Sequence, residues 1–273
     1  VSVIGTGYLG ATHAACMSSL GFEVVGVDTD AAKITQLSNG ELPFYEPGLE
    51  DLLQQEIATG RLTFSTDFNA IADADVHFIC VGTPQLEGSL AADLKYVDAA
   101  LDAVATVCKP GSLVVGKSTV PVGTAARLRE RLLKINPKVD LAWNPEFLRE
   151  GFAVQDTLHP DRIVLGVTNN SDVEVIREIY ASALADNTPL VVTDFATAEL
   201  VKVAANAFLA TKISFINAFA DLADVVGADI GTLADAIGYD ARIGRKFLNA
   251  GIGFGGGCLP KDIRAFMARA QEL

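Results

Sequence analysis

Short apolar runs alternate with stretches of helical period along the first two thirds of the chain. Runs of this length are typical of buried strands, and strands that alternate with helices are typical of a parallel sheet covered on both faces. The pattern therefore predicts an α/β fold with a doubly wound, mainly parallel sheet. Strands are expected at the N-terminus before Gly5, in the run before Asp28, and at residues 75–81, 112–116, 139–143, 162–167 and 189–193.

The pattern changes at Asp194, after which helical period continues without proline or glycine until Gly227. A helix this long does not fit the preceding alternation, so we expect a sheet domain at 1–194 and an all-helical central region at 195–273. The helix is apolar on more than one face, through Val201, Phe208, Ile213, Phe215, Ile216 and Phe219. One stripe can cover the sheet domain while another pairs with a second copy, which predicts a homodimer.

The first strand leads into GTGYLG, in which Gly5, Gly7 and Gly10 form a GxGxxG pattern before a helix. Glycines at this spacing allow a tight turn, the approach of a pyrophosphate and close helix packing, although they also occur in ordinary turns. Asp28 ends the second strand, where a carboxylate binds ribose hydroxyls and repels the 2′-phosphate of NADP. We therefore predict a Rossmann-like domain that binds NAD.

Composition narrows the choice of partners. The chain has 273 residues, of which 50% are hydrophobic and 20% charged, as in globular proteins. A net charge of -13 argues against nucleic acid, because phosphates would be repelled. The only uncharged run long enough for a bilayer, residues 1–22, contains four glycines and is interpreted as strand and helix, so no membrane partner is expected. This run also lacks the basic residues that begin a secretory signal peptide, which favours a cytoplasmic protein.

Four cysteines without a CxxC pair favour a reducing compartment, and no metal site is predicted. Cys16 and Cys80 lie in apolar runs and are interpreted as packing residues, and Cys108 as a helix-end residue. Cys258 differs, because it follows the glycines of GFGGG and precedes Lys261 and Asp262. A thiol there is either a nucleophile activated by nearby charge or a small residue in a tight turn.

Other polar residues follow the predicted strands, at the edge where doubly wound sheets bind ligands. Glu146 and Glu150 are four residues apart in NPEFLREG, so a short helix would place both carboxylates on one face; a solvated helix start is the alternative. Thr119 in STVPVGT fits either a ligand contact or a turn. On the long helix, Lys202 and Asn206 share one face, and the lysine is either functional or simply solvated.

Together, GTGYLG, STVPVGT, NPEFLREG, HPDRIVLG, the long-helix segment AELVKVAANAFLATKISFINAFADL and RIGRKFLNAGIGFGGGCLPKDIRAF resemble the UDP-glucose/GDP-mannose dehydrogenase family of nucleotide-sugar 6-dehydrogenases. The likeness extends in register along the whole chain. It implies oxidation of UDP-glucose at C6 by two NAD, through an aldehyde and a thioester, to UDP-glucuronate. A four-electron oxidation that releases no aldehyde needs a covalent tether, and a cysteine supplies one.

The resemblance also implies roles for individual residues. Cys258 would be the nucleophile, Lys202 and Asn206 would stabilise oxyanions, and Asp262 with Thr119 and Glu146 would handle protons and the hydrolytic water. The expected cofactor-binding residues are Gly5, Gly7, Tyr8, Leu9, Gly10, Asp28, Lys33, Thr83, Thr119 and Glu150. The expected substrate-binding residues are Glu146, Phe147, Leu148, Lys202, Asn206, Arg242, Gly255 and Lys261, with Arg242 reaching the substrate of a neighbouring subunit.

Some features depart from the family pattern. Leu9 stands where valine is commoner, and Gly257 and Leu259 stand where serine and phenylalanine are common. The chain begins without methionine and stops at Leu273, whereas family members continue into a further nucleotide-binding domain. We therefore expect a fragment that by itself binds NAD with weak or no turnover.

Three alternatives remain at this point. The first is an enzyme that oxidises another nucleotide sugar, such as GDP-mannose or a UDP-N-acetylhexosamine. The second is a single-hydride 3-hydroxyacid dehydrogenase, which would share Lys202 and Asn206 but would not need Cys258. The third is an NAD-binding regulator or inactive paralogue, which the presence of every matched catalytic residue disfavours.

Overall fold

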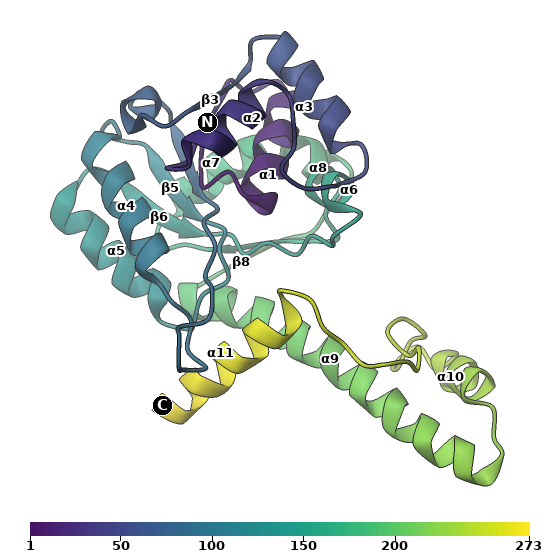
Figure 1. Cartoon of the computed structure of the whole chain (residues 1–273). Helices are drawn as coiled ribbons and strands as arrows, with labels where there is room; N and C mark the ends of the chain where they lie inside the picture. Colours follow the sequence, from purple (N-terminus) through teal and green to yellow (C-terminus); the bar gives the residue numbers. More distant parts are fainter. The chain divides into compact units, whose positions relative to one another are not determined.

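A computed structural model describes residues 1–273. The chain divides into two compact units, each described by itself below. The sheet unit comprises Val1–Pro84 and Asp93–Leu200, and the helical unit comprises Gln85–Ala92 and Val201–Leu273. Figure 1 shows the elements of both along the chain.

The sheet unit is built on one eight-stranded sheet with the order β3-β2-β1-β4-β5-β6-β7-β8. All neighbours pair in parallel except β6 and β7, which are antiparallel and paired in register at Trp143 and Gly166. The predicted doubly wound, mainly parallel fold is thus confirmed. The strands are β1 (Ser2–Ile4), β2 (Val24–Val27), β3 (Leu62–Ser65), β4 (Val76–Ile79), β5 (Leu113–Gly116), β6 (Asp140–Trp143), β7 (Ile163–Gly166) and β8 (Leu190–Thr193).

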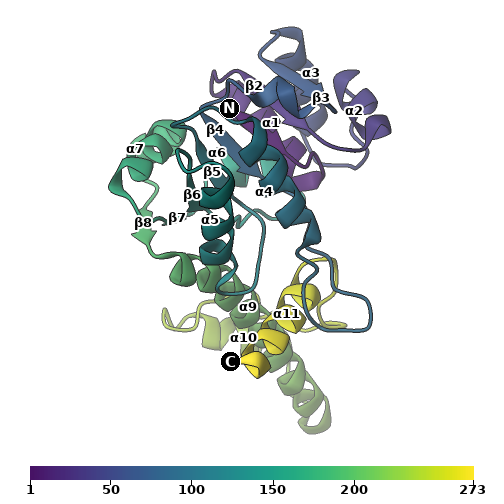
Figure 2. The same cartoon turned by 90° about the vertical axis from the view of Figure 1, so that its left-hand side faces the viewer.

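Helices cover both faces of this sheet (Figures 1 and 2). Consecutive strand residues alternate between two buried clusters: Val115 packs in the cluster with α1, α3 and α7, and Val114 in the one with α4 and α5. This alternation explains why the strands are apolar at nearly every position. The helical segments of the sheet unit are α1 (Tyr8–Ser19), α2 (Ala31–Ser38), α3 (Leu49–Ala58), the 3-10 turn η1 (Phe68–Ile71), α4 (Lys95–Val107), α5 (Thr124–Ile135), α6 (Ala153–Leu158), α7 (Asn170–Ile179) and α8 (Ala181–Ala185).

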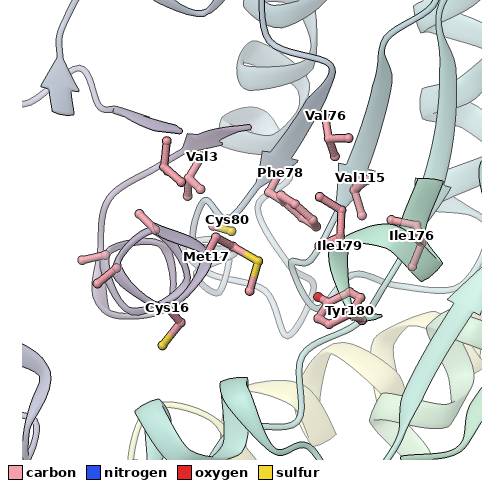
Figure 3. Packing of buried hydrophobic residues seen from close by; sticks show 14 of the residues in the cluster. Val3, Cys16, Met17, Val76, Phe78, Cys80, Val115, Ile176, Ile179 and Tyr180 are labelled. Atoms are coloured by element: carbon pink, nitrogen blue, oxygen red, sulfur yellow. The ribbon is translucent and has the colours of Figure 1, made fainter. Parts of the chain in front are cut away.

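Figure 3 shows part of the first cluster, where Met17 of α1 points toward Phe78 of β4 and Tyr180, whereas Cys16 lies on another side of the helix. Cys16 and Cys80 are buried, as the sequence predicted, and burial raises the pKa of each thiol to about 12. A thiol with such a pKa is protonated at neutral pH, so neither cysteine is a nucleophile.

The helical unit has a much smaller core. The predicted long helix is α9 (Phe195–Val226), whose first residues belong to the sheet unit; α10 (Ile230–Gly238) and α11 (Leu259–Glu272) follow. One cluster of three buried residues, Ile216, Ala234 and Leu248, joins α9, α10 and the loop after α10. By length and composition alone α9 could also cross a membrane, a test that core helices of soluble proteins pass as well.

Candidate functional site

Only glycine fits at Gly5, in the loop between β1 and α1, and at Gly10, in the first turn of α1. Gly5 has a φ of +85°, in the left-handed region that favours glycine. A Cβ on Gly10 would lie 1.8 Å from the carbonyl oxygen of Gly5, so the first turn of α1 packs directly on the loop. The sequence pattern GxGxxG therefore corresponds to a tight strand-to-helix turn.

The N-terminus of α1 faces open space. Gly7 is its N-cap and supplies no side-chain cap, and a Cβ on Gly7 would meet nothing within 4 Å. The first N–H groups of a helix lack partners within the helix and carry the positive end of its dipole. The backbone at Tyr8 and Leu9 is thus arranged to donate to an anion such as a pyrophosphate.

Asp28, directly after β2, lies at the centre of a polar cluster beside this loop. Its carboxylate accepts hydrogen bonds from Thr6 N at 2.8 Å, Asp30 N at 3.1 Å and Lys33 Nζ at 2.8 Å. Partial burial opposes the charged form, but Lys33 and the two amides outweigh it and hold the pKa of Asp28 below its usual value. The structure thus brings together Asp28 and Lys33, both predicted to bind the cofactor.

The loops after β4 and β5 are joined by hydrogen bonds. Thr83 Oγ1 donates to the Thr119 carbonyl at 2.8 Å, and Ser118 Oγ donates to the Val81 carbonyl at 2.7 Å. Thr83 is buried and Thr119 half-buried. Two predicted site residues from separate motifs therefore lie side by side at the carboxyl edge of the sheet.

The expectation of a helix at Glu146 and Glu150 was wrong. Residues 144–149 form an irregular segment, in which Glu146 Oε1 accepts from the backbone N–H groups of Phe147 at 2.8 Å and Leu148 at 3.2 Å. These bonds occupy amides at the position where a helix would begin, and they compete with helix formation. Glu146 is half-buried and Glu150 exposed, so the two carboxylates have different surroundings.

A buried lysine beneath this segment was not predicted. Lys117 Nζ lies 2.9 Å from Glu146 Oε2 and donates to Asn144 Oδ1 at 3.0 Å and to the Tyr180 hydroxyl at 3.1 Å. Tyr180 in turn donates to Asn144 Oδ1 at 2.7 Å. The sequence did contain a signal for this site, since a lysine directly after the buried strand β5 is expected to be buried and to need polar partners.

Glu46 was also missed, and no sequence pattern pointed to it. It is 3% exposed and accepts from Tyr8 Oη, from Gly151 N at 2.8 Å and from Ala153 N at 2.8 Å. One carboxylate thus joins the first turn of α1 to the segment that carries Glu150. Burial and Glu46 raise the pKa of Tyr8, so its hydroxyl stays a donor.

The helical unit brings together three of the predicted residues. Asn206 on α9 donates through Nδ2 to Asp262 Oδ2 at 2.8 Å, and Lys261 Nζ lies 2.7 Å from Asp262 Oδ1. Asp262 is 3% exposed and lies in the first turn of α11. Cys258 is the exposed N-cap of the same helix, so the thiol lies at the positive end of the helix dipole.

The other predicted residues have simpler surroundings. Lys202 is half-buried on α9, one turn before Asn206, and Gly255 is exposed. Arg242 is exposed and pairs with Asp240, with Nη2 and Oδ2 2.6 Å apart. Phe147 stacks under the guanidinium of Arg162 at 4.0 Å, and Leu148 is half-buried. The predicted site residues thus fall into two groups, one in each unit.

The glycine loop, Asp28 and the strand order define the sheet unit as a dinucleotide-binding α/β unit. Residues 1–184 match the NAD binding domain of the UDP-glucose/GDP-mannose dehydrogenase family, and residues 196–273 match its central domain. The chain therefore belongs to this family of NAD-dependent oxidoreductases, and it carries the family's NAD-binding domain.

Individual relatives support the same family assignment. A UDP-glucose 6-dehydrogenase of Rhizobium meliloti (strain 1021) is 46% identical over 100% of this chain and 63% of its own length. A UDP-glucose dehydrogenase structure from Pyrobaculum islandicum superposes with a TM-score of 0.92 at 41% identity, over 99% of this chain and 63% of that one. A GDP-mannose dehydrogenase structure from Pseudomonas aeruginosa gives 0.84 at 36%, over 99% and 64%. The chain thus spans about three fifths of these relatives.

Proposed function

We propose that the protein takes part in the NAD-dependent, four-electron oxidation of UDP-glucose at C6 to UDP-glucuronate. The observation that carries this proposal is the exposed Cys258 thiol at the N-terminus of α11, on a helix whose first turn holds the buried Asp262, which accepts a hydrogen bond from Asn206 of α9. A single hydride transfer needs no thiol, whereas oxidation through a thioester does. The curated relative named UDP-glucose 6-dehydrogenase supports the choice of substrate.

The sheet unit fits NAD. The open backbone at Gly7 and the N-terminus of α1 suit the pyrophosphate, and Asp28 suits the adenosine ribose. Tyr8, Leu9, Lys33, Thr83, Thr119 and Glu150 complete the proposed cofactor contacts. When bound, NAD accepts the hydride that leaves C6 of the sugar.

Cys258 is the proposed nucleophile. Its sulfur adds to the C6 aldehyde formed by the first oxidation, giving a thiohemiacetal, and loss of a second hydride gives a thioester. The dipole of α11 favours the thiolate form of the sulfur. Lys202 and the amide of Asn206 stabilise the negative charge that develops on the C6 oxygen.

Hydrolysis of the thioester releases the sugar acid and restores the thiol. Asp262, which is held by Lys261 and Asn206, takes the proton from the attacking water. Thr119 and Glu146 help to hold that water. Phe147, Leu148, Arg242, Gly255 and Lys261 are the further proposed substrate contacts, and Arg242 acts on the substrate of a second subunit.

We further propose a cytoplasmic homodimer formed through α9, with no nucleic-acid or membrane partner. Exposed apolar residues on α9 support the dimer, namely Phe208, Phe215, Phe219 and Leu222. The proposed domains are 1–194 and 195–273. A monomer in light scattering at micromolar concentration would contradict the dimer.

A second candidate is oxidation of a different nucleotide sugar. The Pseudomonas GDP-mannose dehydrogenase structure is the observation behind this alternative, because it matches 99% of the chain at 36% identity, against 41% for the Pyrobaculum UDP-glucose dehydrogenase structure. The thioester chemistry would be the same, and only the sugar and base would differ.

The yield of NADH per molecule of limiting UDP-glucose tests the proposal, measured on the whole gene product that contains this chain. Two NADH per sugar, lost in Cys258→Ser, are expected. One NADH that does not depend on Cys258 would assign the protein to the single-hydride dehydrogenases. No NADH from UDP-glucose but two from GDP-mannose would favour the second candidate.

A further inference from the structure

The proposed reaction gives no role to Lys117, whose side chain is only 3% exposed at the end of β5. An ammonium has three N–H donors, and three oxygen atoms lie within reach of this one, on Glu146, Asn144 and Tyr180. Burial opposes the charged form, but the Glu146 carboxylate and Tyr180 outweigh it and raise the pKa of Lys117. Lys117 is therefore a fixed positive charge under the segment that carries Glu146.

The hydrogen bonds of Glu146 can be counted in the same way. A carboxylate has about four acceptor positions. The amides of Phe147 and Leu148 take two on Oε1, and Lys117 takes one on Oε2. One position remains, on Oε2, and the Glu146 side chain as a whole is 16% exposed.

Asn144 and Tyr180 hold Lys117 in turn. Asn144 Nδ2 donates to the carbonyl of Val164 in β7 at 2.8 Å, and the Tyr180 hydroxyl donates to Asn144 Oδ1. Both partners are buried, and Asn144 is bonded to β7, so together they hold the ammonium in place. Because Glu146 pairs with this ammonium, its carboxylate is held in place beside it.

We propose that Lys117 is a positioning residue, which fixes the Glu146 carboxylate in one orientation with a single acceptor position on Oε2 for a water molecule or a substrate hydroxyl. That this ligand is the hydrolytic water rests on the proposed function, whereas the fixation of the carboxylate does not. Glu146 then orders its ligand by accepting one hydrogen bond in a set direction.

Amide hydrogen exchange by NMR tests the fixation without any turnover. In Lys117→Met the released carboxylate is expected to leave its backbone partners, so the amides of Phe147 and Leu148 exchange at least about tenfold faster. The amide of Ala142 in β6 keeps its rate. Ser2→Ala is the matched control: it removes the buried hydrogen bond to His77 and leaves the rates at Phe147 and Leu148 unchanged.

Loss of Lys117 leaves Glu146 without its counter-charge, which can prevent folding. Tyr180→Phe is the second variant for this case, because it removes one hydrogen-bond partner of the Lys117 ammonium and keeps the ion pair with Glu146. A smaller increase in exchange at the same two amides is expected. Unchanged rates at Phe147 and Leu148 in the folded variants would overturn the proposal.

Steady-state kinetics tests the consequence for the reaction. A misplaced carboxylate is expected to lower kcat about 10- to 100-fold with the KM for NAD unchanged. An unchanged kcat beside faster exchange would overturn the role of Lys117 in the reaction. If the wild-type protein oxidises no nucleotide sugar, the proposed function fails, but the exchange rates still decide whether Lys117 fixes Glu146.

Discussion

The two units of the chain differ in how they bury apolar surface. The sheet unit has two large clusters, one on each face of the sheet, whereas the helical unit has a cluster of three fully buried residues, Ile216, Ala234 and Leu248. Several aromatic and aliphatic residues of α9 remain exposed. The sheet unit thus has the larger core to stabilise it, while the helical unit combines the proposed nucleophile with exposed apolar side chains on α9.

The largest expected effect is a loss of turnover, without a loss of NAD binding, when Cys258 in the helical unit is replaced. Cys258→Ser is expected to lower turnover about 10³-fold or more, because serine is a far weaker nucleophile at neutral pH. NAD binding, measured by fluorescence titration, is expected to stay unchanged, since all the proposed cofactor contacts lie in the sheet unit. A matched control is Cys108→Ser, at the end of α4. Equal loss of NAD affinity in Cys258→Ser would show that the division of roles is wrong.

A matched pair of core substitutions compares how much each unit contributes to the free energy of unfolding. Leu101→Ala in the sheet unit is expected to lower the free energy of unfolding by about 2–5 kcal/mol, and Leu248→Ala in the helical unit by less than about 2 kcal/mol, because a small cluster collapses around the cavity. Trp143, the only tryptophan, is buried in the sheet unit. Urea unfolding followed by its fluorescence reports that unit, and circular dichroism reports both. If Leu248→Ala shifts the two signals equally, the units unfold as one.

A substitution beside the glycine loop tests whether this part of the sheet unit binds the pyrophosphate. Gly10→Ala forces the loop and α1 apart, because the new Cβ would lie 1.8 Å from Gly5 O. We expect a loss of about 1–3 kcal/mol in stability, and weaker NAD binding in titration. Gly21→Ala, at a glycine of positive φ outside the loop where a Cβ meets no neighbouring atom, is the control for lost stability and should keep the affinity. Undiminished affinity in Gly10→Ala would argue against this loop as the pyrophosphate site.

The smallest expected effect concerns Asp172, at the start of α7. Burial, with the nearby Asp140 carboxylate, raises the pKa of Asp172 to about 6, and its Oδ2 has no hydrogen-bond partner. The folded state therefore binds this proton more tightly than the unfolded state, so ionisation costs stability above about pH 6 and nothing below about pH 4. Asp172→Asn is expected to gain about 1 kcal/mol at pH 7 and nothing at pH 3.5, a figure discounted for solvent screening. Urea midpoints at both pH values measure it, and an equal gain at pH 3.5 would contradict it.

Much of the fold follows from local sequence patterns. The apolar runs indicate buried strands, GTGYLG indicates the first turn, and the segment without proline or glycine indicates α9. The strand β3 was missed because Leu62–Ser65 is short and only partly apolar, and its partner β2 is far away in the sequence. Secondary structure that depends on a distant partner leaves little local signal.

The candidate site was predicted less completely. The glycines and Asp28 could be predicted together because a dinucleotide would set their spacing, and the structure brings Asp28 beside the glycine loop; their contact with NAD stays a prediction. Lys117 and Glu46 were missed because each acts through partners from separate segments, which no local pattern connects. The helix expected at Glu146 fails for a local reason, because its carboxylate accepts from the amides of Phe147 and Leu148.

The antiparallel pairing of β6 and β7 has a mechanical consequence. Its register contains the single pair Trp143 and Gly166, whereas β7 and β8 pair at four positions. The side chain of Asn144 continues this seam by donating to Val164 O, and its other end holds the ammonium of Lys117. One side chain, Asn144, therefore bonds to β7 through Nδ2 and holds Lys117 through Oδ1, so that separation of β6 from β7 would disturb the lysine as well.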